Sequence, residues 1–236
     1  MGTINFTYSF EPEDRAWCKT VEVLLDSETL GLVWEPPEDP PSWTRLTEHQ
    51  CAMCPLKETE TPYCPAALSL VEPVFELGNL LSYRVLRTTV VSEERTTWTI
   101  TPAQRALSSL LGLRMATSGC PVLGRFRPMA RFHLPFSTRD ETLFRVVGMY
   151  LTAQYYRHRD SNEVDWTMDG LRRLYYQIHE VNMTVSQRLR NVVAGDAPMN
   201  AVVRLDLLAH EMPASIECHL AEFKPLFAEL AKNAPL

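Results

Sequence analysis

Glycine, lysine and long apolar segments are all scarce in this sequence. Only 9 glycines occur among its 236 residues, and no glycine-rich loop of the kind that cradles phosphates or dinucleotides is present. No segment approaches the roughly 18 consecutive apolar residues that a membrane-spanning helix requires. Residues 1–6 contain neither the basic region nor the apolar core of a signal peptide. We therefore expect a cytoplasmic protein that does not bind a membrane.

The charge of the chain is negative and unevenly distributed. The formal net charge is -6, which argues against general nucleic-acid binding. Residues 1–100 carry 16 acidic and 7 basic side chains, whereas residues 101–160 carry 9 arginines and only 3 acidic residues. The two segments therefore attract each other, or the basic segment binds an anionic small molecule. A protein partner docked on the helical part is a third interpretation, and the sequence indicates no oligomeric state.

Apolar residues in the first hundred positions alternate with a period of two, which is the pattern of half-buried β-strands. Residues 3–10 and 16–25 flank one turn, and residues 83–91 and 95–100 flank another, so each pair predicts a β-hairpin. A short further strand is expected at residues 30–34. We expect these strands to form one small, mostly antiparallel sheet.

After residue 100 the apolar period changes to about 3.6, which predicts helices. Thr101 and Pro102 suit the N-cap and the first position of a helix. Five helices are expected, over residues 101–116, 137–159, 168–193, 198–211 and 213–232. The expected fold class is α+β: a sheet and a cysteine-rich metal loop in residues 1–100, then a five-helix bundle in residues 101–236. No flexible linker separates the two parts, so residues 1–236 are expected to fold as a single unit.

A cluster of thiols follows a proline-rich connector at residues 35–41. Cys51 and Cys54 are separated by two residues, and Cys64 follows shortly afterwards. Two thiols at this spacing can bind the same soft metal ion, because the short loop lets both sulfurs point inward. In a cytoplasmic protein such cysteines are more often ligands than disulfides. The alternative is that these thiols pack as small apolar side chains.

The fourth ligand and the metal are each left open between two candidates. His49 lies two residues before Cys51, whereas Cys120 would have to come from far along the chain. Zinc held by three thiolates and an imidazole, or by four thiolates, is the favoured centre, and it would fasten the loop in a binding or regulatory protein. An iron–sulfur cluster is the alternative, because proline follows Cys54, Cys64 and Cys120 as it follows a cysteine of bacterial ferredoxins. That alternative, or an open zinc site, makes the protein an enzyme or redox protein acting on an anionic small molecule. Cys18 and Cys218 fit regular strand and helix patterns and are expected in the core.

The basic middle of the chain offers a second candidate site. Arg125, Arg127 and Arg131 could clamp a phosphate or carboxylate while His133 moves a proton. Against this, arginines of a surface loop can simply pair with the acidic first part of the chain. Tyr175 and His179 share one face of a predicted helix and line a pocket or belong to the core. The motifs of zinc proteases and serine hydrolases are absent, so no catalytic residue is assigned.

Several sequence blocks resemble those of a bacterial protein family of unknown function. They are His-x-Cys-x-x-Cys-Pro-Leu at 49–56, Tyr-Cys-Pro-Ala-Ala at 63–67, Ser-Ser-Leu-Leu-Gly at 108–112, Thr-Ser-Gly-Cys-Pro at 117–121 and Arg-Phe-His-Leu-Pro-Phe at 131–136. The resemblance covers most of the chain and implies a bacterial, cytoplasmic protein. It implies no activity, but it places Cys120 and His133 inside family blocks.

Overall fold

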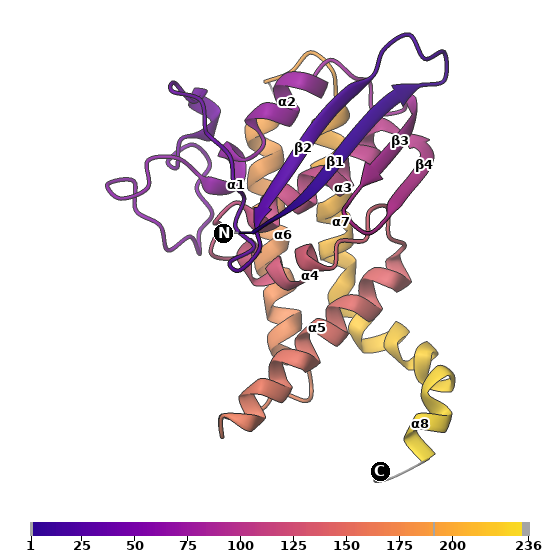
Figure 1. Ribbon diagram of the computed structural model, residues 1–236. Coiled ribbons are helices and arrows are strands. Elements are labelled where there is room, and N and C mark those ends of the chain that lie inside the picture. Colours follow the sequence, from indigo (N-terminus) through magenta and orange to yellow (C-terminus); the bar gives the residue numbers. More distant parts are fainter. Residues whose placement is uncertain (1, 191, 233–236) are drawn as a thin grey trace.

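The computed structural model describes residues 2–190 and 192–232. The fold is α+β, as expected, with one antiparallel sheet and a layer of helices packed on one of its faces (Figure 1). Strand β1 (Thr3–Pro12) pairs with β2 (Lys19–Asp26), and β3 (Val85–Val91) pairs with β4 (Thr96–Pro102). Both predicted hairpins are therefore present.

The two hairpins join into one sheet in the order β2-β1-β3-β4, because β1 also pairs with β3. Alternate residues of β1, such as Phe6 and Tyr8, point into the core, and their neighbours face solvent. Tyr8 lies opposite Val21 of β2 and Val90 of β3. The expected strand at residues 30–34 is reduced to a single bridge between Leu25 and Leu32.

Four long helices make up most of the rest of the molecule. They are α3 (Ala103–Thr117), α5 (Arg139–Arg159), α6 (Asp169–Leu189) and α7 (Ala197–Cys218). The short elements are η1 (Ser42–Thr44), α1 (Pro65–Leu68), α2 (Val71–Leu77), η2 (Leu123–Phe126), α4 (Arg127–Arg131), η3 (His219–Phe227) and α8 (Ala228–Lys232). Helix α7 packs against both α3 and α6 behind the sheet, whereas the far end of α5 projects from the body (Figure 1).

This arrangement differs from the predicted five-helix bundle at two prolines. Strand β4 extends to Pro102, so α3 begins at Ala103 and Thr101 does not cap it. Helix α7 continues through Pro213, where two helices were expected. Proline removes one amide donor from a helix. Here Pro213 is buried, and the packing of α7 against α3 and α6 keeps the helix continuous.

One hydrophobic cluster joins the sheet to the helices. It includes Phe10 and Leu86 from the strands, and Leu107 and Val202 from the helices. Cys18 and Cys218 lie outside it: both are exposed, which corrects the expectation that they are core residues. No helix in the described part of the chain is long and apolar enough to cross a membrane.

Candidate functional site

The cysteine loop, residues 42–64, lies between the proline-rich connector and α1, outside the sheet (Figure 1). Apart from the one turn of η1, it is held by isolated backbone hydrogen bonds. The amide of Cys64 donates to the carbonyl of Thr44 at 2.7 Å, which draws the two ends of the loop together. The amide of Cys54 donates to the carbonyl of Cys51 at 3.0 Å, which closes the tight turn between these two thiols.

Helix α6 fastens this loop with three polar side chains. Glu180, Thr184 and Arg188 are spaced four residues apart, so they lie on the same face of the helix. Glu180 accepts a hydrogen bond from the amide of Ala52 at 2.6 Å, and the Thr184 hydroxyl contacts the Cys51 thiol at 3.1 Å. We call these three residues the polar stripe of α6.

Arg188 makes the largest contribution to the polar stripe. Its two terminal nitrogens donate hydrogen bonds to four loop carbonyls, those of Trp43, Arg45, Leu46 and His49, at 2.6 to 3.2 Å. The residue is only 5% exposed. A buried charge is stable only when it is well hydrogen-bonded, and here the carbonyls supply those bonds without any carboxylate. The loop is therefore folded around one cation.

Cys120 is brought to the cysteine loop by the turn that ends α3. Gly119 has a φ of +96°, a left-handed conformation that glycine adopts without strain, and it lies next to Pro65. Burial raises the pKa of the Cys120 thiol to about 11. Backbone amides of Leu123 and Val122 oppose this rise, and the nearby thiols of Cys64 and Cys51 add to it. Gly119 precedes Cys120 and Pro65 follows Cys64, so the contact between Gly119 and Pro65 brings the two cysteines into the same region.

The three thiols of the loop are also neighbours of one another. Burial raises the pKa of Cys51, Thr184 opposes the rise, and Cys64 and Cys54 add to it. All four thiols are free rather than paired in disulfides. Within residues 2–190 and 192–232, no group of three or more His, Cys, Asp or Glu side chains is arranged so that it could hold a metal ion. The thiols are therefore neighbours, but over these residues they do not yet form a coordination shell.

His49 has a different position from the four thiols. Its side chain is exposed, and its backbone has a φ of 48°. Its carbonyl accepts a hydrogen bond from Arg188. Of the two candidates for a fourth ligand, Cys120 is buried, whereas the side chain of His49 is exposed.

The arginines of the basic middle do not gather around His133. Arg125 is exposed and donates to the Gln177 side chain at 3.3 Å, and Arg131 is exposed on α4. The Nε of Arg127 is buried and has no hydrogen-bond partner among the described residues. His133 instead contacts the sheet: its Nε2 lies 2.5 Å from the Tyr8 hydroxyl, which lies 3.1 Å from the hydroxyl of Ser109.

Burial decides the protonation of this Tyr8–His133 pair. Desolvation, assisted by the positive charge of Arg145, lowers the pKa of His133 to about 3. Desolvation also raises the pKa of the Tyr8 phenol, although Ser109 opposes it. Neutral imidazole can accept a proton at one nitrogen, so the phenol donates to Nε2 and the imidazole proton lies on Nδ1. His133 is therefore a neutral, structural histidine at neutral pH.

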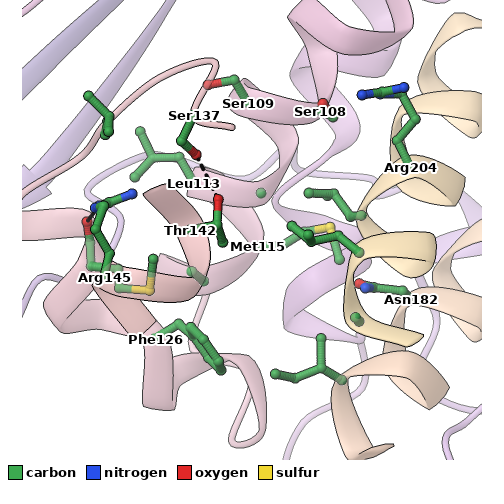
Figure 2. A pocket seen from close by; sticks show the side chains of 18 of the residues that line it. Ser108, Ser109, Leu113, Met115, Phe126, Ser137, Thr142, Arg145, Asn182 and Arg204 are labelled. Carbon is green, nitrogen blue, oxygen red and sulfur yellow. Dashed lines mark hydrogen bonds between the residues drawn. The ribbon is translucent and has the colours of Figure 1, made fainter. Parts of the chain in front are cut away.

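A pocket of about 430 Å³ lies between α3, α4, α5, α6 and α7, next to His133 (Figure 2). This volume is within the range of small-molecule sites in proteins. Apolar side chains such as Leu113, Met115 and Phe126 form much of its wall. Tyr175 lines it and packs edge-on against Phe126, whereas His179 lies outside it and contacts Asp206 at 2.7 Å.

Four arginines line this pocket, and sequence reasoning selected none of them. They are Arg105, Arg139, Arg145 and Arg204. Arg125, Arg127 and Arg131 are not part of the lining, although the neighbouring His133 is. The four arginines come from α3, α5 and α7, so their grouping depends on how the helices pack. No local pattern in the sequence could have identified them.

Comparison with known proteins defines the family but not the activity. The model of the family described as Domain of unknown function (DUF6901) matches residues 4–228. The chain therefore belongs to this family, which confirms the expected membership of an uncharacterised family. Neither a curated protein nor a solved structure matches the chain.

Proposed function

We propose that this protein binds one metal ion through the thiolates of Cys51, Cys54, Cys64 and Cys120, and that zinc is the metal. The observation that carries the proposal is the approach of Gly119 to Pro65, which brings Cys120 to the loop thiols although it follows Cys64 by 56 positions in the sequence. Four free thiols near one another match the four-cysteine ligand set of structural zinc sites. The metal would fasten the cysteine loop to the helical layer in a binding or regulatory protein.

The small number of contacts that hold the loop supports a structural role for the metal. Apart from the polar stripe of α6, the loop is held mainly by a few backbone hydrogen bonds, and much of its surface is exposed. A metal ion that joins two distant segments stabilises the folded chain, because the unfolded chain cannot present the ligands together. Zinc suits this role because it has no redox chemistry and accepts a closed tetrahedral shell.

An iron–sulfur cluster is the second candidate, and one observation favours it. The backbone amides of Val122 and Leu123 stabilise a thiolate at Cys120, and hydrogen bonds to sulfur are among the contacts that tune such clusters. Proline after Cys54, Cys64 and Cys120 points the same way. A cluster would carry electrons, and the protein would then belong to the redox proteins or enzymes.

Metal analysis of protein purified without oxygen tests the proposal. We expect one zinc ion per chain and a colourless solution. A brown solution that contains iron and sulfide would instead favour the iron–sulfur cluster over zinc. Serine at position 54 or 120, as C54S or C120S, should release the metal and lower the melting temperature. Exposed Cys18 supplies the matched control, and C18S should keep both unchanged.

The choice of the fourth ligand needs its own comparison. His49→Ala should keep one zinc per chain, whereas C120S should lose it. The reverse result would make His49, and not Cys120, the fourth ligand. Protein that contains no metal after anaerobic purification, and that does not gain melting temperature with added zinc, would contradict the whole proposal.

A further inference from the structure

We infer that the pocket between the helices is a binding site for a small amphiphilic anion, an apolar chain or ring that carries a carboxylate or phosphate group and a further polar group. This site shares no residue with the cluster of thiols. Three features of the pocket lead to this class of ligand: its apolar wall, one buried amide and its arginines.

The apolar wall indicates what fills the middle of the pocket. Leu113 and Met115 of α3 and Phe126 of η2 face the cavity from one side, and Leu205 and Leu208 of α7 complete it. A cavity of this kind gains affinity by removing apolar ligand surface from water. A ligand that is polar throughout would lose its hydration there without recovering the hydrogen bonds.

Asn182 places an amide in this otherwise apolar wall. Its side chain is 3% exposed and points into the pocket from α6 (Figure 2). Among the residues that the structure describes, its amide has no hydrogen-bond partner. The amide atoms are not among the fully buried, unpartnered atoms of the described residues, so the amide is open to the pocket and free to bond to what enters it. A hydroxyl or carbonyl group of a ligand would satisfy it.

The arginines determine the sign of the ligand's charge. Arg139 and Arg145 are already engaged by hydrogen bonds with Ser215 and with backbone carbonyls. Arg204 has no partner within the described part of the chain, and its guanidinium extends toward the side that carries Ser108 (Figure 2). Glu211 is the one carboxylate that lines the pocket among the described residues. Guanidinium groups bind carboxylates and phosphates with paired hydrogen bonds, so an anion is favoured at Arg204.

Isothermal titration calorimetry with ten-carbon probes tests the class of ligand. Decanoate and decyl phosphate carry the anion, decanol lacks a charge, and decyltrimethylammonium carries the opposite one. At least one of the two anions should bind with a 1:1 stoichiometry and at least about tenfold more tightly than decanol, since a hydrogen bond to a charged group is worth that much. Failure of both anions to bind, or equal binding by the cation, would overturn the inference.

Variants locate the binding. Arg204→Glu should weaken binding of the anion at least about tenfold. Arg159→Glu, a control on the exposed end of α5, should not change it. Ala116→Leu fills the cavity and should abolish binding; its circular dichroism and zinc content show whether it is folded. Binding that survives both Arg204→Glu and a folded Ala116→Leu would place the ligand elsewhere.

The role of Asn182 has a separate test with hydroxylated probes. Among decanoates that carry one hydroxyl at carbon 3, 5 or 10, at least one should bind more tightly than decanoate itself. Asn182→Leu should remove this preference, because leucine offers the hydroxyl no hydrogen-bond partner. A preference that persists in Asn182→Leu would exclude the amide from recognition.

Discussion

Acid should destabilise this protein through one histidine, His133. Its Nε2 accepts a hydrogen bond from Tyr8, and its ring packs edge-on against Phe6 at 5.3 Å. Burial lowers its pKa from 6.5 to about 3. Between these two pH values the unfolded chain binds a proton at this position and the folded chain does not. The free energy of unfolding therefore falls as the pH is lowered through 6.5, and the loss continues until about pH 3.

The size of the effect follows from the shift. Each pH unit in this window costs about 1.4 kcal/mol for a single proton. From pH 6.5 to pH 5 the loss is at most about 2 kcal/mol, since His133 is partly rather than fully buried. A loss of this size is large compared with the total stability of most domains, about 5–15 kcal/mol.

Urea denaturation of the wild-type protein and His133→Gln at pH 7, 6 and 5 measures this contribution. Glutamine offers Tyr8 an acceptor but does not titrate. The wild-type protein should lose more than the variant between pH 7 and pH 5, by at most about 2 kcal/mol. Acid would release a metal held by the thiols, but it would do so in both proteins, so the difference isolates His133. Equal losses, or an imidazole resonance of His133 that titrates between pH 5 and 7, would refute the reasoning.

Three further perturbations test other parts of the structure. Arg188→Met leaves four loop carbonyls without their donor. It should lower the free energy of unfolding by about 3–5 kcal/mol and expose the loop amides to hydrogen exchange. The control Arg190→Met changes an exposed side chain and should cost less than about 0.5 kcal/mol. A loop that stays protected in Arg188→Met would disprove the role of this cation. The guanidinium of Arg114 is only 1% exposed and donates a hydrogen bond to Glu72 at 2.7 Å. Arg114→Met should therefore lower the free energy of unfolding, measured by chemical denaturation, by about 3–5 kcal/mol. A loss below about 1 kcal/mol would argue against the importance of this pair. Desolvation alone would raise the pKa of Asp165, but hydrogen bonds to its carboxylate outweigh this effect and lower the pKa. The ionised carboxylate therefore stabilises the folded chain at neutral pH, and this stabilisation is lost as the pH falls below 3.8. Asp165→Asn should be less stable at pH 7 and lose less stability in acid, and parallel acid profiles would contradict this.

The sequence predicted the sheet well because its signals are local. Alternation of apolar residues and turn residues between paired segments are enough to define both hairpins of this fold. The N-terminus of α5 was also nearly correct: Ser137 was expected to open the helix, and the capping box is formed one residue later by Thr138 and Glu141. Local chemistry of this kind is decided within a few residues, so it can be read before the fold is known.

The errors occur where packing overrides local preference. Proline at position 213 ordinarily ends a helix, but burial against α3 and α6 keeps α7 continuous there. Cys18 fits the pattern of a strand and yet is exposed, because it precedes β2. The pocket depends entirely on tertiary structure, since its arginines lie on three helices separated by long segments. The spacing of Cys51, Cys54 and Cys64 can be read from the sequence, whereas the position of Cys120 beside their loop depends on how distant segments pack.

The polar stripe of α6 also sets the order in which the chain can mature. Arg188 bonds to carbonyls that precede it by up to 145 residues, so these contacts close only after most of the chain has been synthesised. Until then Cys51, Cys54 and Cys64 belong to a segment without its anchor, and their thiols are open to oxidants, proteases and unsuitable metals. The sheet and α3 involve earlier residues and can pack first. Anchoring of the cysteine loop is therefore a late event in the folding of this chain.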